Sequence, residues 1–163
     1  MLKKILITIF IYSIFTTYVF SAPSGSDSST KTNSGYDKAV NLINKAKNFE
    51  KKGKLEKANK QYEKARKLLV ELNNKIPNKP DTLNCLGFTT RKLGDFEGGE
   101  KYYLEGLAID PKHIGINEYL GELYVVTKRH NLAVERLQVL KGCNCKEYKQ
   151  LEKIIAGEEV SKY

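Results

Sequence analysis

The stretch that decides the fold is LNCLGFTTRKLGDFEGGEKYYLEGLAIDP, residues 83–111 of a chain of 163. It alternates small residues with large ones, and much of its pattern returns after a shift of 34 residues. The shift places Leu86-Gly87 on Leu120-Gly121, Gly99 on Ala133, and Tyr103 on Leu137. Self-similarity at a fixed period indicates a repeat architecture, in which each unit buries its apolar face against its neighbours.

An earlier copy of the pattern precedes this stretch at a spacing of 41 residues. This longer shift places Leu42 on Leu83, Gly53 on Gly94, and Tyr62 on Tyr103. The seven extra residues amount to about two helical turns, and they fall near residues 72–79. We therefore expect the second helix of the first pair to be longer than usual.

A pair of helices that recurs every 34 residues with this pattern resembles the tetratricopeptide repeat (TPR) family. The resemblance implies an all-α, right-handed solenoid of about three helix pairs. We expect these pairs at 36–79, 80–113 and 114–145, a capping helix at 146–157, and a tail at 158–163. Residues 128–131 replace the usual glycine turn of a pair, and we expect Asn131 to supply the turn geometry.

The first residues of the chain have the pattern of an export signal. A basic start at Lys3 and Lys4 precedes an apolar, uncharged run at 5–20, and small and polar residues follow. This pattern predicts a signal peptide at 1–21 that is cleaved after Ser21. The alternative is an uncleaved membrane anchor, but the run spans only about 24 Å as a helix, short of the roughly 30 Å hydrocarbon core. The composition of residues 22–35 predicts a flexible linker. Because a cleaved signal peptide directs export, we expect the domain to be periplasmic or secreted.

The net charge of +9 is concentrated in the first helix pair. Residues 37–79 contain 13 Lys or Arg against 5 Asp or Glu, whereas residues 80–163 contain 12 against 13. Two interpretations stay open. The Lys residues form a solvated helix surface, with Glu at helical spacing, or the first pair contacts an anionic partner such as a membrane surface. We expect no nucleic-acid partner, because the chain has no recognised binding motif.

No set of residues with catalytic spacing stands out, and we expect a protein that is not an enzyme and needs no cofactor. His113 and His130 fall in a loop and a turn, and we interpret them as surface residues. Cys143 and Cys145 allow several outcomes: a disulfide with each other, a disulfide with Cys85, buried thiols, a thiol-redox function, or a metal site. The thiol-redox or metal-handling function is the alternative to an interaction module.

The resemblance also implies a binding face, because the first helix of each TPR pair lines a concave groove. The side chains expected to be exposed there come from the second and third pairs: Asn84, Phe88, Arg91, Lys92, Glu118, Glu122 and Val125-Val126. Ile43, Lys47 and Glu50 are the corresponding residues of the first pair. Such a mixed surface suits a peptide or protein segment. We expect Arg91→Glu to weaken partner capture without unfolding the domain.

Two further expectations follow from the resemblance. Ile43, Cys85 and Gly115 stand where the TPR proteins that bind C-terminal carboxylates have Lys, Asn or Arg, so we do not expect that activity. Three repeats are near the lower limit for a stable stack, so we expect that the protein can self-associate.

Overall fold

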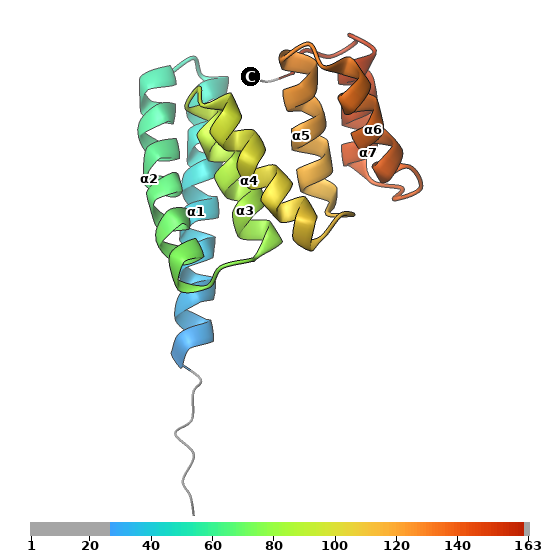
Figure 1. The fold of residues 1–163 in the computed structure, drawn as a ribbon. Helices are drawn as coiled ribbons and strands as arrows, with labels where there is room; N and C mark the ends of the chain where they lie inside the picture. The colour runs from blue at the N-terminus through green and yellow to red at the C-terminus, as the bar shows by residue number, and fades with distance from the viewer. Residues whose placement is uncertain (1–26, 162–163) are drawn as a thin grey trace, which may run out of the picture.

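The computed structural model describes residues 27–161, and every regular element in that range is an α-helix. The helices are α1 (Asp27–Lys51), α2 (Leu55–Lys75), α3 (Pro80–Lys92), α4 (Phe96–Ile109), α5 (Ile114–Val126), α6 (His130–Leu140) and α7 (Lys146–Ile155). Figure 1 shows them stacked in chain order, from α1 and α2 at one end to α6 and α7 at the other. The predicted all-α architecture is confirmed.

The helices pack as three successive pairs and a cap. The pairs are α1 with α2, α3 with α4, and α5 with α6, while α2 contacts α3 and α4 contacts α5. The first helices also contact one another along the stack, α1 with α3 and α3 with α5. Helix α7 packs on both α5 and α6, so it extends the layer of first helices by one position. We call the side of the stack formed by α1, α3, α5 and α7 the inner face.

Small residues lie where helices cross. A Cβ atom on Gly87 of α3 would lie 2.6 Å from Cδ1 of Tyr103 in α4. In the next repeat, a Cβ atom on Gly121 of α5 would lie 2.8 Å from Cδ1 of Leu151 in α7. Separations this short leave no room for a methyl group, since protein interiors are close-packed. The small residue that recurs after 34 positions therefore permits close helix packing in both repeats, against the second helix of the pair at Gly87 and against the cap at Gly121.

The helix lengths agree with the sequence in one respect and differ in another. Helix α2 has 21 residues, compared with 14 in α4 and 11 in α6, so the predicted long second helix is confirmed. Helix α1, however, begins at Asp27 and includes most of the expected linker at 22–35. Its buried stripe at Ala39, Ile43 and Ala46 fixes the helix, and adding residues to a formed helix needs no new nucleus. The expected signal peptide and residues 22–26 lie outside the described residues.

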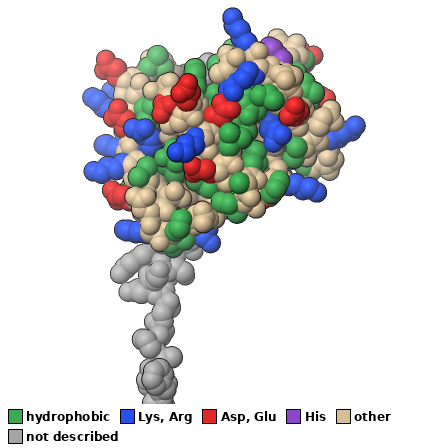
Figure 2. Space-filling view, viewed as in Figure 1, with side chains coloured by type: hydrophobic (Ala, Val, Ile, Leu, Met, Phe, Trp, Pro, Cys, Tyr) green, Lys and Arg blue, Asp and Glu red, His purple; other side chains and the backbone are tan. Residues whose placement is uncertain are grey.

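The face that carries α2, α4 and α6 is mixed, with charged side chains of both signs beside exposed apolar ones such as Val70, Leu104 and Val134. Figure 2 shows Lys and Arg side chains interspersed with Asp and Glu over this face. Lys57, Lys60, Lys64 and Lys67 of α2 are all exposed. Within residues 27–161, no helix combines the length and the hydropathy needed to cross a membrane. Contact of the first pair with a membrane surface stays a prediction.

Candidate functional site

Three first helices meet at a cluster of side chains on the inner face. Lys47 of α1 places its Nζ 4.4 Å from the ring centroid of Phe88 in α3 and 3.4 Å from the hydroxyl of Tyr119 in α5. The Phe88 and Tyr119 rings are 5.1 Å apart, a separation at which aromatic rings attract one another. An ammonium group over an aromatic face is likewise attractive. These contacts join α1, α3 and α5 across two repeat boundaries.

A second set of contacts, made by Arg91, joins α3 to α5. Arg91 donates from Nη1 to the backbone oxygen of Tyr119 at 2.6 Å. Its Nη2 lies 3.5 Å from Oε2 of Glu122, in an ion pair whose side chains are 0% and 2% exposed. We refer to Lys47, Phe88, Arg91, Glu118, Tyr119 and Glu122 together as the inner-face cluster.

The expectation that the predicted groove side chains are exposed is wrong for five of them. Ile43, Phe88, Arg91, Glu118 and Glu122 are between 2% and 7% exposed. The first helices of neighbouring repeats lie so close that these side chains fill the space between them instead of lining an open groove. Buried charged groups require partners, and Arg91 has a carbonyl and a carboxylate within reach. The burial of Arg91 indicates that Arg91→Glu destabilises the domain, in place of the expected variant that leaves the fold intact.

The other predicted groove residues are partly buried. Lys92 of α3 pairs with Glu50 of α1 at 2.6 Å, and the Lys92 side chain is 7% exposed. Tyr62 of α2 donates its hydroxyl proton to the same carboxylate at 2.8 Å, so a second polar contact links the first pair to α3. Asn84 is half-buried, and its side-chain oxygen has no hydrogen-bond partner. Among the predicted groove residues, Asn84 therefore carries the acceptor that the folded chain leaves unused.

Glu118 is the titrating group of the inner-face cluster. Burial is the main reason that its pKa is raised to about 7 from 4.5, and the nearby carboxylates of Glu122 and Glu147 raise it further. Lys47 of α1 and Lys146 of α7 act in the opposite direction. The same burial lowers the pKa of the Lys47 ammonium. The inner face thus holds a carboxyl group that gains and loses its proton near neutral pH.

We predict that Glu118→Gln stabilises the domain by about 2–3 kcal/mol at pH 8 and has little effect near pH 4.5. The folded state binds the Glu118 proton more tightly than the unfolded state does. The wild type therefore loses stability as the pH rises from 4.5 through 7, and the uncharged glutamine removes that loss. Urea unfolding of both proteins at several pH values measures the difference. A difference that does not grow with pH would contradict the raised pKa.

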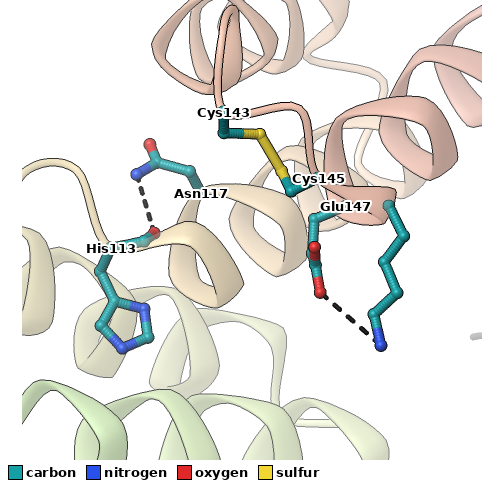
Figure 3. The surroundings of a disulfide bond; sticks show 6 residues. His113, Asn117, Cys143, Cys145 and Glu147 are labelled. Carbon is teal, nitrogen blue, oxygen red and sulfur yellow. Dashed lines mark hydrogen bonds and ion pairs between the residues drawn. A yellow bond between two sulfur atoms is a disulfide. The ribbon is translucent and has the colours of Figure 1, made fainter.

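Two of the three cysteines lie at the joint between the last pair and the cap. Cys143 and Cys145 form a disulfide with a Cα–Cα distance of 5.2 Å, and Cys85 is a free, half-buried thiol beside the hydroxyl of Tyr36. Figure 3 shows the disulfide together with Asn117 of α5 and with Glu147 at the start of α7. Closing a loop of three residues stabilises the fold by only about 1.6 kcal/mol in the chain-entropy model. The bridge therefore fixes the start of α7 and contributes little to the stability of the stack.

The structure also bears on the metal alternative. Within the part of the chain that the structure describes, no group of three or more His, Cys, Asp and Glu side chains is arranged to hold a metal ion. His113 caps the start of α5 instead, because its Nδ1 accepts from the Ile116 backbone N–H at 3.1 Å. Its Nε2 lies 3.1 Å from Oδ1 of Asp81. His113 therefore joins the second pair to the third.

Sequence reasoning missed two residues of the inner face. Tyr119 was not among the groove candidates, although it contacts Lys47, Phe88 and Arg91. Its place on the inner face could have been predicted from the repeat. Tyr119 lies 34 residues after Cys85 and therefore occupies the equivalent position of the next first helix, directly after Glu118. Ser161 is buried beside Glu122, and the tail that carries it has no periodic pattern from which this contact could be predicted.

Comparison with known proteins shows which known fold the helix arrangement is similar to. No family model and no curated protein matches the sequence. A solved structure of the Yersinia enterocolitica type III secretion chaperone SycD, in complex with a peptide of the translocator YopD, is similar with a TM-score of 0.51 and 20% identity, over 74% of this chain and 88% of that one. This chain has a TPR-like helical fold. A second SycD structure, described as an alternative dimer, is similar with a TM-score of 0.52 and 21% identity over the same shares of both chains.

Proposed function

We propose that this protein is a non-enzymatic interaction module that holds a peptide or protein segment against its inner face. The observation that carries the proposal is the meeting of α1, α3 and α5 at the contact of Lys47, Phe88 and Tyr119. Lys47 and Tyr119 are only partly buried, so their outer surfaces are available to a ligand. A cation and an aromatic hydroxyl on one surface suit a segment with both polar and apolar side chains.

The fold supports the same conclusion by analogy. Concave faces of helical solenoids commonly bind extended segments, and one similar structure is a chaperone in complex with a peptide of a translocator. The burial of Phe88 and Arg91 moves the proposed contact surface from an open groove to the outer atoms of Lys47 and Tyr119. A second similar structure is described as an alternative dimer, and self-association of this protein stays a prediction.

We expect Lys47→Met to weaken binding of a segment at the inner face about tenfold. Methionine keeps much of the length and apolar surface of lysine but removes the ammonium group from the Phe88 ring. A random peptide library displayed on phage is selected on the purified protein. The affinity of the selected peptide is then measured by fluorescence anisotropy for the wild type and for the variant.

The matched control is Lys64→Met, which makes the same substitution at an exposed position of α2. The control is expected to bind the selected peptide as tightly as the wild type does. Equal loss in both variants, or no loss in Lys47→Met, would place the peptide elsewhere on the protein. Failure to select any peptide would contradict the interaction module itself.

We propose further that the protein is exported and acts in the periplasm or outside the cell. The support is the basic, apolar and small-residue pattern of residues 1–21. The expected mature protein begins at Ala22, five residues before the start of α1 at Asp27. The mass of the intact protein recovered from the cell envelope measures this. A mass that includes Met1 and the apolar run would contradict cleavage and favour a membrane anchor.

A further inference from the structure

The chain reverses direction where α7 ends. Gly157 adopts a φ of 74°, a left-handed conformation that favours glycine. The Gly157 backbone N–H donates to the Ile154 oxygen at 3.2 Å, and the Glu158 N–H donates to the Lys153 oxygen at 2.9 Å. This pair of bonds is the Schellman motif, which ends a helix and sets the direction of the chain that follows. The turn therefore directs residues 158–161 back along the molecule.

Two contacts hold this returning segment. Lys153 of α7 pairs with Glu159 at 3.1 Å. Two residues later, Ser161 is only 9% exposed, whereas Val160 beside it is 88% exposed. This is the reverse of what burial of apolar surface alone would produce, because valine is far more often buried than serine. The backbone path and polar contacts, and not hydrophobicity, therefore place Ser161.

Ser161 lies on the inner face. Its hydroxyl donates to Oε2 of Glu122 over 3.5 Å, and the same carboxylate oxygen pairs with Arg91. Because Arg91 belongs to α3 and Glu122 to α5, the returning tail reaches the boundary between the second and third repeats. It lies on the same side of the stack as Lys47, Phe88 and Tyr119.

We infer that the C-terminal tail, Gly157–Ser161, is a strap that covers the part of the inner face where α3 meets α5. A partner segment that binds there must displace it. The inference rests on the proposed function and adds an occupant and a form of regulation to it. The strap is covalently attached, so its local concentration is in the millimolar range and a weak contact suffices to keep it in place. A partner then binds with an affinity lowered by the fraction of molecules in which the strap is displaced.

The contact between Ser161 and Glu122 also indicates which kind of partner segment could displace the strap. A segment that replaces Ser161 is favoured when it presents a hydrogen-bond donor to the Glu122 carboxylate, because this buried group keeps its pairing with Arg91 but loses the hydroxyl donor when the tail leaves. A serine, threonine or amide side chain supplies this donor, and an acidic side chain does not. Partners with an Asp or Glu at this position are excluded by charge repulsion with Glu122.

The test uses two full-length variants that add the same charge at neighbouring positions. Ser161→Glu places a second carboxylate against Glu122 and is expected to release the strap, whereas Val160→Glu changes an exposed side chain and is expected to leave it seated. Heteronuclear NOE measurements on the ¹⁵N-labelled protein report the mobility of residue 161. A peptide is selected from the phage library on Ser161→Glu, and its affinity is measured for all three proteins.

We expect residue 161 to be as rigid as α7 in the wild type and in Val160→Glu, and mobile in Ser161→Glu. We expect the selected peptide to bind Ser161→Glu about tenfold more tightly than the other two proteins. A mobile Ser161 in the wild type would overturn the strap, whatever the peptide does. A released tail with unchanged affinity would overturn the competition but leave the proposed function intact. Failure of Ser161→Glu to select any peptide would contradict the proposed function and the competition together, while the NOE still reports the seat of the tail.

Discussion

Replacing Arg91 with alanine is expected to destabilise the domain by about 3–5 kcal/mol, because removal of one partner of a buried ion pair leaves the other charge poorly compensated. The substitution takes the guanidinium away from the Glu122 carboxylate and from the Tyr119 backbone oxygen, which it approaches at 2.6 Å. Urea unfolding followed by circular dichroism at the helical band measures the loss. Arg91→Glu places a second negative charge beside Glu122 and is expected to be worse still.

Two further variants separate the buried contact from a general effect of losing an arginine. Arg66→Ala removes an exposed arginine from α2 and is expected to change stability by less than about 0.5 kcal/mol. The double variant Arg91→Leu, Glu122→Leu replaces both charges by apolar side chains and is expected to recover at least half of the loss, since buried pairs often tolerate that exchange. A stable Arg91→Ala protein would show that the arginine does not join α3 to α5.

Replacing Leu151 with alanine is expected to cost about 3–4 kcal/mol, because the removed side chain leaves a cavity where α7 meets α5. Leu151 is fully buried, and its methyl groups fill the space left by the absent side chain of Gly121. The expected result is a protein whose cap detaches at lower urea concentration than the wild type unfolds. Hydrogen exchange of the α7 amides, measured beside the urea midpoint, shows whether the cap opens first.

The matched control for the cap is Lys149→Ala, an exposed substitution on the same helix. It is expected to be near neutral, since alanine and lysine differ little in helix propensity. If Leu151→Ala were as stable as this control, α7 would not be part of the cooperative fold. A loss confined to α7, with α1 to α4 still protected, would show that the stack unfolds from its C-terminal end.

The helix arrangement could be predicted because its determinants are local in the sequence. Gly87 and Gly121 recur at the period of the repeat and both lie at close helix contacts, and Pro80 lies at the first position of α3 as expected. One local prediction was wrong. The turn between α5 and α6 has its left-handed residue at Lys128, with a φ of 60°, and not at Asn131. Asn131 lies inside α6, which begins at His130.

The burial of the candidate site could not be predicted, because it depends on the distance between helices that belong to different repeats. Nothing within α3 alone distinguishes an exposed Arg91 from one that reaches the backbone of Tyr119, which is 28 residues away in sequence. The periodic pattern shows which side chains face the next first helix, but not whether a space remains between them. Ser161 was beyond prediction for a similar reason, since its position follows from the turn at Gly157 and not from any repeat.

The position of α7 limits how the protein could become longer. Helix α7 takes the place that the first helix of a fourth pair would occupy, and its outer surface carries exposed Lys146, Lys149 and Lys153. A charged surface of this kind disfavours the stacking of another pair on α7, so simple addition at this end is the less favourable way to lengthen the array. An extra helix pair would have to be inserted between Leu140 and Lys146, ahead of the cap. The short segment that contains the disulfide is thus the junction at which the array could gain or lose a repeat by duplication while both of its ends stay intact.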